Sequence, residues 1–362
     1  MKKIVTGIAL LSFSSLSFAG VSAVGRFDYK NLKTKSISKV TNTTTSTFKD
    51  TSGEYEVNLA RILTAAKIND SLTFDMELDL KQASGTKSNG GALNDFVDSM
   101  VLTKNFGENF SVKVGKQDPL VGGFEWTVAD ADIYSASSFY ANAPLNSVGL
   151  SGHYSFLGHT LSLVHLETTE NLPANTTAQD RKVTGALLAG TYLDGMLSTR
   201  LSYHKSGITV TPSATSDVKS DLTAIGFQID KNMFVVQLDY LMAKNKDAGT
   251  TDASVTTDAK LTSLVAHVRY NHENYKPFVK YIMDKSKGSY ELTRDVAGAE
   301  SKRSVIEVGM EYVPNKNEDM RYHVVYSSAE TKQDTAATGV TVRESKKDDT
   351  FFAGVKFGFN LL

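Results

Sequence analysis

A set of charged residues stands at positions where they could act together electrostatically. Four acids fall within one irregular stretch, residues 117–146: Asp118, Glu125, Asp130 and Asp132. Seven bases stand on the polar faces of segments with alternating polarity: Arg26, Arg61, Lys113, Arg200, Arg269, Lys280 and Arg321. Acids and bases on opposite sides of a narrow aqueous passage would produce a transverse field that orders water and screens solutes. For any single residue, the simpler interpretation of an ordinary solvated charge stays open.

Other kinds of site are not indicated by the sequence. The chain has 7 His and no Cys, and no two His stand four residues apart, so a metal site is not expected. His153 near Ser151 and His204 near Ser202 could form catalytic pairs, but such neighbours are common on one strand face. Gly122-Gly123 is not followed by Lys-Ser/Thr, so it is not a phosphate-binding loop. We expect no cofactor and no enzyme activity.

The first residues have the pattern of a secretory signal peptide. A basic start, Met1-Lys2-Lys3, precedes an apolar run from Ile4 to Phe18, and small residues allow cleavage after Ala19. The run is shorter than the ~20 residues of a spanning helix, which argues against the alternative of a membrane anchor. We therefore expect an exported domain, residues 20–362. With a net charge of only −1 before cleavage, a nucleic-acid partner is not expected.

Alternation of apolar and polar residues marks strands throughout the chain. In the last stretch, Phe351–Leu362, one face is wholly apolar and the other is mostly small or polar. In residues 72–81, five large apolar side chains alternate with Thr73 and four charges. Burying those charges in a soluble core would be very costly, whereas a wall between lipid and water satisfies both faces. The pattern predicts membrane-spanning strands.

The layout of the segments predicts a closed barrel. We expect about 16 strands, joined alternately by short turns with Asn, Asp or Gly and by long polar loops, such as 31–52 and 328–349. Short periplasmic turns and long external loops are typical of outer-membrane barrels. The second strand, 54–68, is irregular because Arg61 falls among apolar residues, and a bulge would change its phase. The fold class predicted is an all-β transmembrane antiparallel barrel.

At this point the chain resembles the 16-stranded porins of Gram-negative outer membranes. The stretch 111–117, ending in Val114-Gly115-Lys116-Gln117, is similar to the end of the fifth porin strand, and Gly122-Gly123-Phe124-Glu125 is similar to the acidic Gly-rich part of the following loop. The resemblance implies that residues 117–146 fold into the lumen as a constriction loop. It also implies a homotrimer, contact with outer-membrane lipid and lipopolysaccharide, and assembly through the C-terminal strand by the barrel-assembly machinery. Porins usually end in an aromatic residue, whereas this chain ends in Leu362.

The expected function is passive diffusion of small hydrophilic solutes and ions across the outer membrane. Three alternatives stay open. The channel could be selective for a solute such as phosphate or a sugar, although the single Trp126 argues against a long aromatic track. The barrel could be a plugged structural or adhesive protein. The third alternative, a soluble secreted β-protein, is disfavoured by the charges of residues 73–81.

Overall fold

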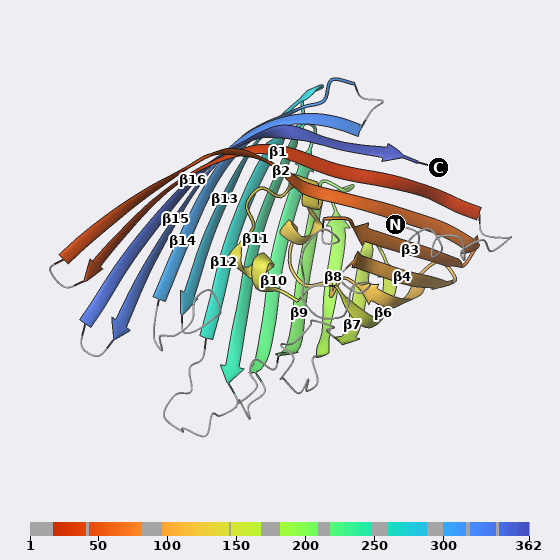
Figure 1. Ribbon diagram of the computed structural model, residues 1–362. Coiled ribbons are helices and arrows are strands. Elements are labelled where there is room, and N and C mark those ends of the chain that lie inside the picture. The colour runs from red at the N-terminus through yellow and green to blue at the C-terminus, as the bar shows by residue number, and fades with distance from the viewer. Residues whose placement is uncertain are drawn as a thin grey trace, which may run out of the picture.

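The computed structural model describes residues 17–40, 43–81, 96–144, 146–167, 182–208, 218–247, 259–287, 300–315, 319–337 and 340–361. Residues 1–16 of the predicted signal peptide, 1–19, lie outside the described residues, and residues 17–19 begin the first strand. The described residues form sixteen antiparallel strands in one closed barrel, in which β1 pairs with both β2 and β16 (Figure 1). No helix among the described residues is long and apolar enough to span a membrane. The predicted fold class is confirmed.

The strands have the following bounds: β1 Ser17–Val40, β2 Thr43–Asn69, β3 Leu72–Asp79, β4 Val97–Phe106, β5 Phe110–Gln117, β6 Ser147–Phe156, β7 His159–Glu167, β8 Lys182–Tyr192, β9 Leu197–Ile208, β10 Val218–Lys231, β11 Phe234–Asp247, β12 Ala259–Tyr270, β13 Tyr275–Lys287, β14 Glu300–Tyr312, β15 Asp319–Ala337 and β16 Val340–Asn360. At the end of the barrel where the two chain termini lie, short turns connect consecutive strands (Figure 1). Closure pairs the backbone of the first and last strands, which removes the unpaired edges that lipid would not tolerate.

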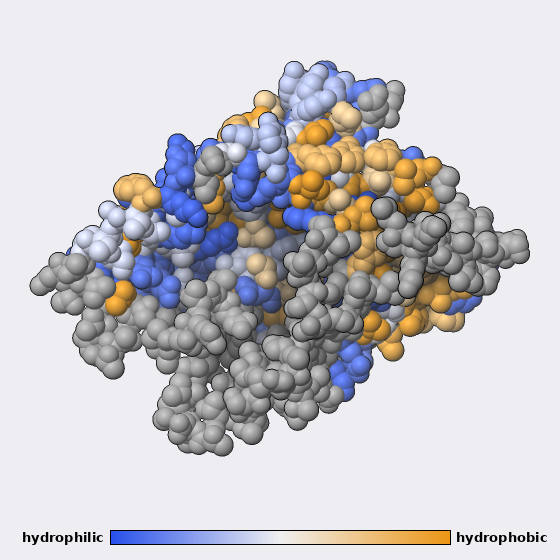
Figure 2. Space-filling model, viewed as in Figure 1, coloured by the Kyte–Doolittle hydropathy of each residue, from blue (hydrophilic) through white to orange (hydrophobic). Residues whose placement is uncertain are grey.

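The outer and inner faces of the wall follow the predicted alternation. On β16, Phe351, Phe359 and Leu361 are exposed on the outside, whereas Lys356 between them is buried inside the barrel. The exposed apolar residues of the other strands form the rest of the lipid-facing surface. Figure 2 shows hydrophobic residues over the wall near the chain termini and hydrophilic residues over the strands that project at the opposite end. The charged faces therefore point into the lumen.

Two predicted loops are strands instead. Residues 31–40 and 43–52 continue β1 and β2, and residues 328–337 and 340–349 continue β15 and β16. They are paired throughout, as in Lys35 opposite Phe48 and Ser328 opposite Asp349. Both faces of this extension carry polar residues, so the sequence shows no apolar alternation there. Backbone pairing with the neighbouring strands keeps it extended without a buried face.

The predicted bulge in the second strand is confirmed. Arg26 on β1 pairs with Leu59, but Phe27 pairs with Val57, so Asn58 is an extra residue in β2. An extra residue turns the following side chains to the other face. Tyr55 and Val57 face outward, whereas Leu59 and Arg61 line the interior. Arg61 thus reaches the lumen because of this bulge.

Candidate functional site

The loop between β5 and β6 folds into the barrel and carries three short helical turns (Figure 1). They are the 3-10 helices η3, Glu125–Thr127, and η4, Asp130–Asp132, and the helix α3, Ser138–Asn142. The Ser137 hydroxyl caps α3 by accepting a hydrogen bond from the Tyr140 amide at 3.0 Å. Such short turns have no long apolar period, so residues 117–146 show no regular pattern in the sequence.

The first contact between the loop and the wall is at Asp239 on β11. Its carboxylate accepts hydrogen bonds from the amides of Phe124 at 2.8 Å and Glu125 at 2.6 Å. A β-carbon on either Gly123 or Gly226 would overlap this carboxylate. Glycine at both positions therefore lets the loop backbone approach the wall closely.

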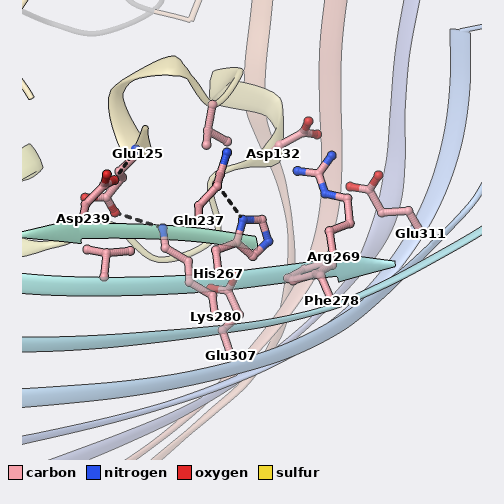
Figure 3. Close-up of a pocket in the computed structure, with 12 residues that line it drawn as sticks. Glu125, Asp132, Gln237, Asp239, His267, Arg269, Phe278, Lys280, Glu307 and Glu311 are labelled. Atoms are coloured by element: carbon pink, nitrogen blue, oxygen red, sulfur yellow. Dashed lines mark hydrogen bonds and ion pairs between the residues drawn. The ribbon is translucent and has the colours of Figure 1, made fainter. Parts of the chain in front are cut away.

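Glu125 makes the second contact, with Lys280 on β13. The Lys280 Nζ lies 2.9 Å from the Glu125 Oε1 and donates a second hydrogen bond to the Ser135 carbonyl at 2.7 Å. The same Glu125 oxygen accepts from the Ser137 amide at 3.0 Å. Figure 3 shows these side chains around a space of only about 20 Å³, lined by residues of the loop and of β11–β14. Since one water needs roughly 10–15 Å³, this space is too small for a solute.

Asp132 makes the third contact, with two bases on neighbouring strands. Its Oδ1 lies 3.0 Å from an Arg321 nitrogen and 2.8 Å from the Lys356 Nζ. Glu311 on β14 binds both of these bases from the wall side. Burial alone would raise the pKa of Asp132, but the positive charges of Lys356 and Arg321 lower it to about 2. The carboxylate is therefore charged at any physiological pH.

Arg26 binds the loop backbone rather than an acid of the loop. Its Nη1 donates to the carbonyls of Ala131 at 3.1 Å and Ile133 at 2.7 Å, and its Nε pairs with Asp28 at 2.7 Å. The guanidinium also lies 4.3 Å from the centre of the Tyr134 ring. Cations over aromatic faces are attracted by the ring quadrupole. These contacts fix the middle of the loop on β1.

Apolar packing completes the attachment of the loop. Phe139 of α3 is almost fully buried among Leu241, Leu261 and Ile282 of the wall. The cluster lies inside the barrel, where the neighbouring positions are mostly polar. Burying a phenylalanine side chain contributes about 1.5–3 kcal/mol. The loop is thus held against β9–β16 by both charge and apolar contact.

The opposite side of the loop is open. A cavity of about 580 Å³ separates it from the wall of β2–β6. Arg61 lies on this wall, 2.6 Å from Asp130 of the loop and 3.5 Å from Asp98, and it also pairs with Glu77. At the beginning of the loop, Asp118 accepts a hydrogen bond from the Trp126 indole at 2.7 Å, and burial raises its pKa.

The cavity continues towards the end of the barrel that carries the chain termini. A second space, of about 320 Å³, is lined by Gly20, Ser22 and Asn360 at that end. Leu63 and Glu77 line both spaces. The two spaces therefore adjoin each other along one side of the lumen.

The predicted site residues fall into three groups. Arg26, Lys280 and Arg321 bind the loop directly, together with Glu125 and Asp132. Arg61, Lys113, Asp118 and Asp130 line the open cavity, and Arg61 also binds the loop there through Asp130. Arg200 and Arg269 face the interior without an ion pair to any described residue, and Arg269 lines the small space in Figure 3. The predicted bases lie on strand faces that point into the barrel. Residue type alone could not distinguish the bases that only bind the loop from the bases that line the open cavity.

Several residues of the site were not predicted. Asp239, Asp284, Arg303, Glu311 and Lys356 all hold the loop or the bases that bind it; Asp284, for example, accepts from the Ser138 hydroxyl at 2.8 Å and pairs with Arg303 at 2.9 Å. Each stands on the polar face of its strand, so alternation could have identified it as lumen-facing. Its pairing with the loop depends on how far along the strand it lies, which the sequence does not indicate.

The described residues contain no group of three His, Cys, Asp or Glu side chains that could hold a metal ion. His153 contacts Ser151 at 2.9 Å and Ser162 at 2.8 Å, in a row of polar residues that face the lumen. The contacts of this row are those of a structural hydrogen-bond network.

Comparison with known proteins agrees with the geometry. Residues 39–273 match the family model of the phosphate-selective porins O and P. The chain belongs to this family. The protein is therefore an outer-membrane porin, a channel and not an enzyme. The search of curated proteins found no match to the chain.

Solved structures share the porin fold at low sequence identity. The anion-selective porin from Comamonas acidovorans is 13% identical, with a TM-score of 0.59 over 94% of this chain and 99% of that chain. The outer-membrane channel DcaP of Acinetobacter baumannii is 14% identical, with a TM-score of 0.59 over 96% and 99%. In-vitro folded OmpT of Vibrio cholerae, in a trimer form, is 12% identical, with a TM-score of 0.52 over 91% and 99%.

Proposed function

We propose that solutes diffuse passively through the one-sided passage between the loop and β2–β6. The observation that carries this proposal is the asymmetry of the lumen. The loop is bound through Glu125, Asp132 and its backbone to β11–β16 and β1. A space of only about 20 Å³ lies between it and β11–β14, whereas a cavity of about 580 Å³ lies on its other side. A porin needs a water-filled path, and this is where the described residues leave one.

Four of the predicted residues are proposed to set the electrostatic field of the constriction. Asp118 and Asp130 stand on the loop, and Arg61 and Lys113 stand on the wall opposite. The remaining predicted residues that contact the loop are proposed to fix its position, so they act on pore size. Arg200 and Arg269 are proposed to contribute to the field only at a distance.

The assembly is proposed to be a homotrimer in lipid and lipopolysaccharide. The trimer form of OmpT, which shares the fold, supports the trimer. Export through a signal peptide cleaved after Ala19 is supported by the pattern of residues 1–19. The barrel-assembly machinery is proposed to recognise the outward apolar face of β16 together with Leu361, the residue after the strand.

Selective transport of phosphate is the second candidate, because the matching family is described as phosphate-selective. The deciding experiment records single-channel currents of purified, detergent-folded protein in a planar bilayer with KCl. Ohmic steps would establish an open passage, and competition of phosphate with the chloride current would favour the second candidate. Folded, inserted protein without steps would contradict both candidates and favour a plugged structural barrel.

A further inference from the structure

Part of the wall of the open cavity is apolar, which a water-filled lumen does not require. Leu59 and Leu63 of β2 face into it because the extra residue Asn58 reverses the faces of the strand. Val24 and Val101 line the same wall. An apolar surface that faces a passage gains free energy when an apolar part of a solute covers it, at roughly 25 cal/mol per Å².

The loop presents apolar groups to the same cavity. Leu120, Trp126 and Val128 line it from the loop side. The Trp126 indole is fixed by its hydrogen bond to Asp118 and by packing on the Tyr140 ring, with 4.7 Å between ring centres. A solute between the two surfaces therefore meets apolar groups on both sides, one of them an aromatic ring held in place.

The charges that line the cavity are mainly negative. Its lining includes four carboxylates, those of Glu77, Asp98, Asp118 and Asp130, but only two bases among the described residues, Arg61 and Lys113. Three of the four carboxylates surround the single Arg61 guanidinium, which cannot neutralise them all. The side chains of these three acids are 23–37% exposed, more than the 18% of Arg61. The carboxylates are therefore more accessible to a solute in the cavity than the guanidinium is.

We propose that this passage selects cations over anions and favours organic cations with an apolar body, such as aliphatic or aromatic primary amines. The carboxylates around Arg61 attract the ammonium group, and the strip formed by Val24, Leu59, Leu63 and Val101 contacts the hydrocarbon part. This inference rests on the proposed passage between the loop and β2–β6. It gives the chain a charge preference opposite to the phosphate selectivity by which its family is described.

The first test is the reversal potential of the wild-type channel in a KCl gradient. We expect potassium to permeate at least about threefold better than chloride, because four carboxylates and only two bases of the described residues line the cavity at close range. The Glu77→Gln, Asp98→Asn double variant should bring the ratio to about one or below. Lys113→Gln leaves the ion pairs of Arg61 intact and should raise the ratio. Glu330→Gln, on the exposed strand extension, is the matched control and should leave it unchanged.

The second test separates the apolar strip from the charge. Benzylammonium added at millimolar concentration should reduce the potassium current, whereas ammonium and benzoate at the same concentration should not. The Leu59→Ser, Leu63→Ser double variant should weaken this block severalfold with an unchanged reversal potential. Heat-modifiable mobility on gels would show that each variant is folded.

The possible outcomes distinguish the inferred preference for organic cations from the proposed passage on which it rests. Folded protein without conductance steps would overturn the proposed passage itself. Open channels that prefer chloride would overturn the cation preference and leave the passage standing. A cation preference with equal effects of benzylammonium and ammonium would overturn the part that concerns organic cations.

Discussion

Lys280 and Glu125 lie 2.9 Å apart and join strand β13 to the constriction loop. Both side chains are almost fully buried, so neither charge can be solvated if the other is removed. A buried ion pair adds little net stability, but removing one partner is strongly destabilising. The pair therefore specifies where the loop lies, and pore size depends on a residue of the wall.

Replacing Lys280 by Met should release this part of the loop. Leaving the Glu125 carboxylate buried without a partner costs about 3–5 kcal/mol, and moving the loop into water avoids that cost. We expect larger and noisier single-channel steps than in the wild type. The double variant Glu125→Gln, Lys280→Met should partly restore them, because no buried charge is left. Lys285→Met, on the exposed side of the same strand, is the control; steps of wild-type size in Lys280→Met would contradict the assignment.

Replacing Gly123 by Ala should displace the beginning of the loop. The added methyl group would overlap the Asp239 carboxylate, which accepts hydrogen bonds from the next two amides. Overpacking of this kind costs about 1–3 kcal/mol. The expected result is a folded barrel with altered conductance and protease cleavage near residue 123. Gly152→Ala, on β6, where the added β-carbon would lie 3.8 Å from its nearest neighbour, is the control for a glycine change; resistance of Gly123→Ala to the protease would argue against the contact.

Acid should break the Asp132 contact of the loop only well below neutral pH. The pKa of Asp132 is lowered to about 2, so its contribution to loop binding is complete above its ordinary value near 3.8. That contribution is lost as the pH falls through about 2. In neutral lipid, Asp132→Asn should therefore show noisier single-channel currents than the wild type from pH 7 down to pH 4.5, and the difference should disappear only at lower pH. Equal noise of the wild type and Asp132→Asn at pH 4.5 would contradict this account.

Much of the architecture could be predicted from the sequence because lipid and water impose opposite requirements on alternate residues. The faces of residues 72–81 and 351–361 follow directly from this rule. It fails at 31–52, where both faces of the strands meet water and no alternation is required. The sequence of these paired strands therefore resembles that of a polar loop.

Two features of the site could not be predicted from the sequence: how far along its strand each residue lies, and which residues pair with the loop. Alternation correctly placed Arg26, Lys280 and Arg321 inside, but not the closed side of the lumen on which they bind the loop. Arg61 depended on the extra residue Asn58, whose presence the irregular phase of 54–68 indicated. Which side of the loop is open follows from the summed contacts of the loop, and these are set by distances between strands far apart in the sequence.

The bulge at Asn58 gives the last prediction. Deleting Asn58 forces one half of β2 onto the wrong face: either Arg61 turns towards lipid or Tyr55 and Val57 turn inward. A charged arginine on the lipid face of a barrel costs about 2–4 kcal/mol at the bilayer midplane. We expect the deletion to lose most of its heat-modifiable folded form on gels. Asn58→Ser keeps the residue count and should fold, at the cost only of the hydrogen bond from Asn58 to Asp28. A deletion variant that folds fully with wild-type ion selectivity would show that the bulge does not direct Arg61 into the passage.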